Sequence, residues 1–206
     1  MISNEILDIV VAGIILTAIW AQIGTFIKQK IRIVSLQALL LALYVILLGY
    51  DLSNMDLIIL GILISALRGF SVPLVLTRKI KTSSYKVRER ISDTSWITVA
   101  SIFILIFSFT IYRVTFAPVG YETVGDAGLS LLLQGMFLMV SRRNKFSQFM
   151  GYMEEENAII MLGIGIISLP LIIEASILLD VFALLIVSSV LIAGRFESLK
   201  YEELMG

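Results

Sequence analysis

The sequence predicts an all-α integral membrane protein with about seven transmembrane helices. Of its 206 residues, 58% are hydrophobic and only 16% are charged, whereas soluble domains carry about 25% charged residues. The apolar residues form continuous runs close to the length of about 20 residues that a helix needs to cross a bilayer. Because these runs do not alternate between apolar and polar positions, they favour helices over the strands of a membrane barrel.

Seven apolar segments are candidate spans, although the fifth is short and the second is near the lower limit. The predicted spans are Leu7–Ile27, Ile33–Gly49, Leu57–Leu76, Ser95–Val114, Ala127–Val140, Phe146–Ser168 and Leu171–Ala193. No small-residue cleavage site follows the first segment, so we expect it to remain in the protein as a span.

The charges between these spans predict their orientation. Basic residues follow the first, third, fifth and last spans, whereas the connections after the second and fourth are acidic. The first connection is expected to hold Lys28, Lys30 and Arg32, and the fourth to hold Glu122 and Asp126. All but two of the 16 basic residues, Arg68 and Arg113, therefore fall on one side.

The positive-inside rule assigns that side to the cytoplasm. The amino terminus is then outside and the carboxyl terminus cytoplasmic, which requires an odd number of spans, and the cell membrane is the expected location. The basic segment Arg78–Asp93 is expected to be a solvated loop, or else a docking surface for a peripheral subunit or anionic lipid headgroups.

A weak internal repeat divides the chain. Two regions each have a basic turn, a span, a short outer connection and a span that ends in basic residues. The pattern predicts two three-helix units, residues 1–80 and 124–206, separated by a cytoplasmic loop, a connecting helix and an outer loop over residues 81–123. Repeats of this kind are common in proteins that move ions or substrates across membranes.

The residue types that are missing exclude several functions. The chain has no cysteine and no histidine, so it cannot ligate an iron–sulfur cluster, a haem or a histidine-based zinc ion. We expect no cofactor and no catalytic site in this chain. Equal numbers of basic and acidic residues also give no reason to expect a nucleic-acid partner.

Ionisable residues inside the predicted spans are the functional candidates. Arg68 lies near the middle of the third span, where a lone charge costs roughly 3 kcal/mol on insertion scales and needs a partner. Glu154, Glu155 and Glu156 are consecutive in the sixth span and cover about 200° of its circumference. We therefore expect Glu154 and Glu156 to face different neighbours, with Glu155 between them. Pro73 is expected to open a hydrogen-bond gap near Arg68.

The seventh predicted span adds two further acids, Glu174 and Asp180. Asp180 is expected at the depth of Glu156 on an antiparallel neighbour, where two carboxylates couple and can exchange protons near neutral pH. Two alternatives remain. The acids could pair with basic residues of adjoining subunits and only fix assembly, and Glu174 could lie at the membrane interface.

Several of these residues carry a resemblance to the hydrogenase-4 component E (HyfE) family. The stretches that match are Ser141-Arg142-Arg143-Asn144, Phe149-Met150-Gly151-Tyr152, Glu156-Asn157 and the Val72-Pro73-Leu74 that follows Arg68. The carboxyl-terminal unit is also similar to the NuoK subunit of complex I and the MrpC subunit of cation/proton antiporters. In the complex I pattern the first acid falls nearer Met153 than Glu156, a departure of about one helical turn, whereas Asp180 matches the second acid.

The resemblance implies a non-catalytic membrane-arm subunit of a group 4 [NiFe] hydrogenase of the formate hydrogenlyase type. Nickel–iron and iron–sulfur sites would lie in a peripheral arm, and antiporter-like and anchor subunits would be the membrane neighbours. Glu156 and Asp180 would carry protons or sodium ions, Arg68 would bias their charge state, and Glu154 and Glu155 would link to adjoining subunits. The alternatives are a structural adaptor or a subunit of an antiporter or complex I-like oxidoreductase. A stand-alone small-solute transporter is disfavoured.

Overall fold

A computed structural model of the chain describes residues 4–82, 94–116, 122–166 and 178, and every element in these ranges is helical. The elements are α1 (Asn4–Ile23), α2 (Ile27–Asp51), α3 (Met55–Ile64), the π-helical segment η1 (Ser65–Ser71), α4 (Val72–Thr82), α5 (Thr94–Phe116), α6 (Glu122–Ser141) and α7 (Lys145–Ile166). The predicted seventh span, with Glu174 and Asp180, lies outside the described residues.

Five of these helices are long and apolar enough to cross a membrane. They are α1, α2, the continuous helix Met55–Arg78 that joins α3, η1 and α4, and then α5 and α6. These five match the first five predicted spans to within a few residues at most ends. The α7 helix has 22 residues and coincides with the sixth predicted span, but it carries three consecutive glutamates. The predicted all-helical class and the membrane-type helices are therefore confirmed for the described part of the chain.

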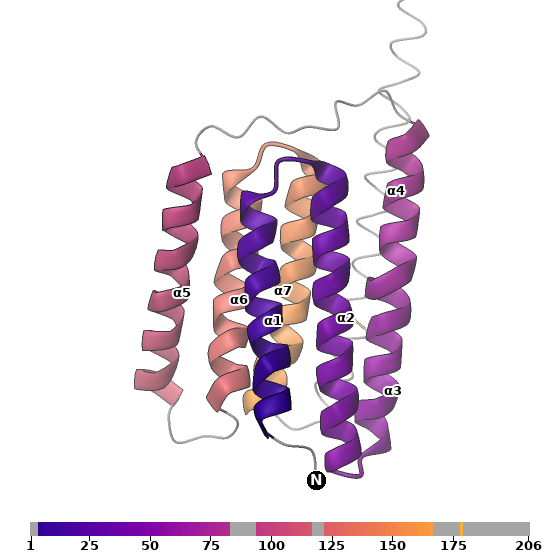
Figure 1. Cartoon of the computed structure of the whole chain (residues 1–206), viewed down its shortest axis with the longest axis vertical. Coiled ribbons are helices and arrows are strands. Elements are labelled where there is room, and N and C mark those ends of the chain that lie inside the picture. The colour runs from indigo at the N-terminus through magenta and orange to yellow at the C-terminus, as the bar shows by residue number, and fades with distance from the viewer. Residues whose placement is uncertain (1–3, 83–93, 117–121, 167–177, 179–206) are drawn as a thin grey trace, which may run out of the picture.

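The helices lie side by side in one bundle, with α5 at one edge and the α3–α4 helix at the other (Figure 1). Helix α1 contacts α2, α5 and α6, while α7 packs against α6 and α2. The buried core includes Ile14, Leu41, Leu57 and Leu131. Large apolar side chains such as Phe103 on α5 point outward, as expected for helices whose outer faces contact lipid.

The connections α1–α2 and α6–α7 and the end of α4 lie at one end of the bundle, and the connection α2–α3 lies at the other (Figure 1). Two expectations about these ends are wrong. Lys28, Lys30 and Arg32 lie in the first turns of α2, because that helix begins at Ile27. Asp126 lies inside α6, because a buried ion pair with Arg113 of α5, 3.0 Å between Nε and Oδ2, keeps it in the bundle.

A close contact of α6 with α7 sets the rotation of the acidic stretch. A Cβ atom on Gly135 would lie 2.7 Å from the Gly151 carbonyl oxygen, and one on Gly151 would lie 2.7 Å from the Gly135 carbonyl oxygen. Only glycine permits such an approach, which is a common device where membrane helices pack. The Gly135 backbone also lies against the Glu155 side chain, so this contact directs Glu155 toward α6 and its neighbours on either side away from it.

Candidate functional site

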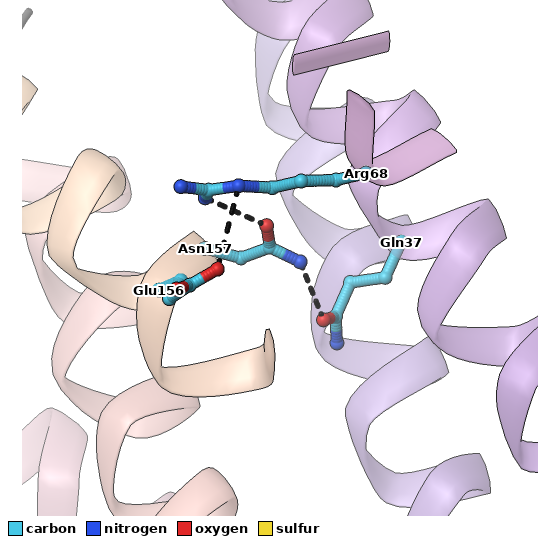
Figure 2. A network of polar contacts seen from close by, with 4 residues as sticks. All are labelled: Gln37, Arg68, Glu156 and Asn157. Atoms are coloured by element: carbon cyan, nitrogen blue, oxygen red, sulfur yellow. Dashed lines mark hydrogen bonds and ion pairs between the residues drawn. The ribbon is translucent and has the colours of Figure 1, made fainter. Parts of the chain in front are cut away.

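Five polar side chains meet inside the bundle where α2, η1 and α7 come together. They are Gln37 from α2, Arg68 from η1, and Glu154, Glu156 and Asn157 from α7; four of them are drawn in Figure 2. Arg68 is 1% exposed and the other four are 0% exposed. We refer to these five residues as the central network.

The central network is a continuous chain of contacts. Arg68 Nε lies 3.6 Å from Glu156 Oε2, and Arg68 Nη1 donates a hydrogen bond of 3.4 Å to Asn157 Oδ1. Asn157 Nδ2 donates to Gln37 Oε1 at 3.1 Å. Gln37 Nε2 in turn donates to Glu154 Oε1 at 3.4 Å. The two carboxylates of α7 are therefore connected through an arginine and two amides contributed by three helical segments.

The π-helical turn explains how Arg68 reaches this position. Pro73 has no N–H group, so it cannot donate to the carbonyl of Gly69, four residues earlier. Ser35 of α2 supplies the missing donor, because its Oγ donates to the Gly69 oxygen at 2.5 Å. Wide turns of this kind are often found at functional sites. The expected hydrogen-bond gap near Arg68 is confirmed, and α2 fills it.

The two carboxylates have different surroundings. Glu156 faces the Arg68 guanidinium and also interacts with the Tyr152 hydroxyl one turn earlier. Glu154 faces the neutral Gln37 amide through Oε1, and its Oε2 has no hydrogen-bond partner among the described residues. The 3.6 Å ion pair is longer than the 2.7–2.9 Å typical of a tight charge-assisted hydrogen bond. One carboxylate therefore has a loosely held cation, and the other has an oxygen open to a proton or an ion.

The structure brings three of the predicted site residues together: Arg68, Glu154 and Glu156. Glu154 and Glu156 face different elements, α2 and η1, as expected. Glu154 is completely buried against Gln37, however, and does not lie on a surface that could reach an adjoining subunit. Glu155 is half-buried on the α6 side and lies outside the central network.

Two buried residues were missed by the sequence analysis. Gln37 was treated as part of an apolar span, although a long amide in such a run is itself a sign of a polar partner. Lys30 was assigned to a solvated connection, yet it is 0% exposed and its Nζ donates to Ser147 Oγ of α7 at 3.0 Å.

A second buried polar group joins α1, α5 and α6. Ser101 Oγ donates to Gln134 Oε1 at 2.9 Å, and Gln134 Nε2 donates to the Ser101 carbonyl oxygen at 2.8 Å. Gln22 Nε2 donates to the Gln134 carbonyl oxygen at 2.7 Å, and Arg142 donates to the Gln22 carbonyl oxygen. We refer to Gln22, Ser101 and Gln134 as the amide cluster.

Comparison with known proteins gives one similarity along nearly the whole chain. No family model matches the sequence, and no solved structure matches it. The chain is 26% identical over 198 residues to the uncharacterized protein Rv0085 of Mycobacterium tuberculosis (strain ATCC 25618 / H37Rv). The alignment covers 92% of this chain and 88% of that protein. The chain is therefore similar to a protein of nearly the same length, and this similarity assigns neither a family nor an activity.

Proposed function

We propose that this chain is a multi-pass subunit of the cell membrane that contributes buried carboxylates to a path for protons or sodium ions. The observation that supports this proposal is the central network, in which Glu154 and Glu156 are connected inside the bundle through Arg68, Asn157 and Gln37. Ionisable side chains in membrane helices are costly, and they commonly mark routes for ions.

The different surroundings of the two acids suggest how the path operates. Arg68 compensates the charge of Glu156, whereas Glu154 is fully buried beside a neutral amide. A carboxylate buried without a cation is commonly neutralised by taking up a proton. Movement of the Arg68 guanidinium away from Glu156 would make that acid the better proton acceptor. In this proposal the two carboxylates alternate as carriers, and water completes the route because they do not contact each other.

The orientation that we infer has seven spans, with the amino terminus outside and the carboxyl terminus in the cytoplasm. The bundle supports it, because the basic residues near the start of α2, the end of α4 and the α6–α7 connection lie at one end (Figure 1). The positive-inside rule assigns that end to the cytoplasm. The second carrier that the sequence suggests, Asp180, would come from the seventh span.

The parent assembly that we propose is a complex I-related membrane-bound hydrogenase of the formate hydrogenlyase type. This proposal rests on the resemblance of the α6–α7 region and of the Arg68 segment to the HyfE family. Antiporter-like and anchor subunits would be the membrane neighbours, and the peripheral arm would hold the nickel–iron and iron–sulfur centres. Redox events there would change the charge state of one buried site, and the next site would respond electrostatically.

The test uses the intact complex purified through a tag on this chain. Glu154→Gln, Glu156→Gln and Asp180→Asn are compared with the wild type for subunit content, hydrogen turnover and ion uptake into sealed vesicles. We expect complete complexes whose coupled ion uptake falls at least tenfold, because an amide cannot carry a proton. Full ion uptake in all three variants, with subunits and turnover intact, would overturn the proposal.

A structural adaptor is the second candidate, and the Arg68–Glu156 ion pair favours it, because a buried pair can also fix the fold of an assembly. In that case Glu156→Gln would release subunits from the complex without changing the ion uptake of the complexes that remain. A stand-alone transporter would be supported if the purified chain alone moved solutes in proteoliposomes.

A further inference from the structure

A buried lysine lies on the same helix interface as the central network. Lys30, in the first turn of α2, is completely buried, and its ammonium donates to Ser147 Oγ near the start of α7. Its neighbours in sequence differ, because Lys28 is half-buried and Arg32 is exposed. A fully buried ammonium carries a large desolvation cost, so its position calls for a reason beyond solubility or membrane orientation.

The spacing along both helices places Lys30 in line with Glu154. Helices α2 and α7 begin at the same end of the bundle and run side by side (Figure 1). Lys30 contacts Ser147, and seven residues later on each helix Gln37 contacts Glu154. Seven residues are two turns, a rise of about 10.5 Å. The two contacts are therefore stacked on one interface, about two turns apart.

The space between the two contacts is apolar. Val34 of α2 and Met150 and Met153 of α7 are buried between or beside them in one hydrophobic cluster. Mobile salt does not enter such a region, so a charge at one contact acts on the other with little screening. With an effective dielectric constant of about 20, an ammonium at about 10 Å changes the proton affinity of a carboxylate by roughly tenfold.

We propose that Lys30 is a positioning residue of the ion path, whose charge at the basic end of the bundle controls whether Glu154 holds a proton. This inference rests on the proposed function for its biological purpose, but the coupling of Lys30 to Glu154 is a property of the chain itself. When Lys30 is charged, Glu154 releases its proton more readily. When the charge is removed, Glu154 retains the proton.

Other charged groups also face Glu154, and they define the controls. Glu155, Glu156 and Tyr152 lie on α7, Arg68 comes from η1, and Arg142 ends the neighbouring α6 connection. Arg68 is the closer cation, but its guanidinium faces Glu156 and Asn157. Lys30 is on the Glu154 side of the network, so its removal should act on Glu154 more than on Glu156.

The experiment is an infrared pH titration of the full-length chain in lipid vesicles, which follows the carbonyl band of protonated carboxylic acids. The band of Glu154 is identified by its loss in Glu154→Gln. In Lys30→Met we expect the midpoint pH of this band to rise by about one pH unit, a tenfold change in proton affinity. Lys30→Arg keeps the charge and should restore the midpoint, and Lys28→Met should change it by less than about a third of that amount.

A midpoint that stays the same in Lys30→Met, with wild-type helix content, would overturn the inference. If Lys30→Met does not fold, Ser147→Ala provides the second measurement: it removes the hydroxyl that holds the ammonium and should move the midpoint in either direction by a measurable fraction of a unit, and no movement counts against the inference. Failure of the proposed function gives a different result, in which the Lys30 coupling is present in the titration but Glu154→Gln leaves ion uptake by the complex unchanged.

Discussion

Two groups of buried polar side chains lie in this bundle, and their chemistry differs. The amide cluster of Gln22, Ser101 and Gln134 joins α1, α5 and α6 with neutral hydrogen bonds of 2.7–2.9 Å. The central network joins α2, η1 and α7 with contacts of 3.1–3.6 Å that include an arginine and two carboxylates. Both groups are fully buried.

The difference shows what packing alone requires. Short bonds that satisfy both polar atoms of the Gln134 side chain are sufficient to connect three helices without any charge. Amide and hydroxyl contacts of this kind commonly connect membrane helices. The central network spends more solvation free energy on longer contacts, so helix packing does not account for its charges. This contrast favours a functional role for the central network and a structural role for the amide cluster.

The largest effect is expected from Arg68→Met. The substitution keeps the length of the side chain but leaves Glu156 buried without the guanidinium, and breaking a buried pair in this way costs about 3–5 kcal/mol. The midpoint of thermal unfolding of the purified chain, followed by circular dichroism, measures the loss. Arg32→Met is the control, because Arg32 is exposed on α2. Equal midpoints in the two variants would show that the Arg68 pair contributes nothing to the fold.

The comparison itself is tested by removing one amide from each group. Gln134→Leu and Gln37→Leu should each cost about 1–3 kcal/mol, since each leaves buried polar partners unsatisfied. Ion uptake by the parent complex should survive Gln134→Leu and fall severalfold in Gln37→Leu, because only Gln37 contacts both Glu154 and Asn157. If Gln134→Leu abolishes ion uptake in a fully assembled complex, the amide cluster belongs to the path and the distinction fails.

A smaller effect is expected at the π-helical turn. Ser35→Ala removes the donor to the Gly69 oxygen and should destabilise the chain by about 1 kcal/mol. Pro73→Ala restores an N–H that can bond the same carbonyl, so Ser35→Ala should cost less in that background. A double-mutant cycle on unfolding free energies measures this coupling. Additive effects would mean that Ser35 and Pro73 act independently.

Part of this architecture could be predicted from the sequence, and the limits have physical causes. Uninterrupted apolar runs identified the helices, and charges inside those runs identified Arg68, Glu154 and Glu156. The facing of three consecutive glutamates depends on the rotation of α7, which the Gly135–Gly151 contact sets, and a contact between distant residues is not visible in either segment alone.

Lys30 and Gln37 were missed for a related reason. A lysine near a helix end is normally solvated, and one glutamine in an apolar run gives no indication of its partner. Lys30 is buried because α7 presents Ser147 at the same level, and Gln37 is ordered because Glu154 and Asn157 lie opposite it. Both facts depend on the relative register of α2 and α7, which only the packed bundle defines.

The smallest effect is expected from Glu155→Gln, the closest chemical match to Glu154→Gln. Glu155 is half-buried on the α6 side and outside the central network, so the substitution should change the unfolding free energy by less than about 0.5 kcal/mol. Ion uptake by the complex should remain within twofold of the wild type, whereas Glu154→Gln lowers it at least tenfold.

The two adjacent residues thereby separate position from composition. Both variants remove one negative charge from the same turn of α7, so a general loss of charge in the membrane would affect them equally. Equal loss of ion uptake in the two variants, with assembly intact, would contradict the assignment of the path to the α2–η1–α7 interface. Loss of copurified subunits in Glu155→Gln alone would instead identify Glu155 as the contact to an adjoining subunit, because its carboxylate is the one of the three that remains accessible from outside the bundle.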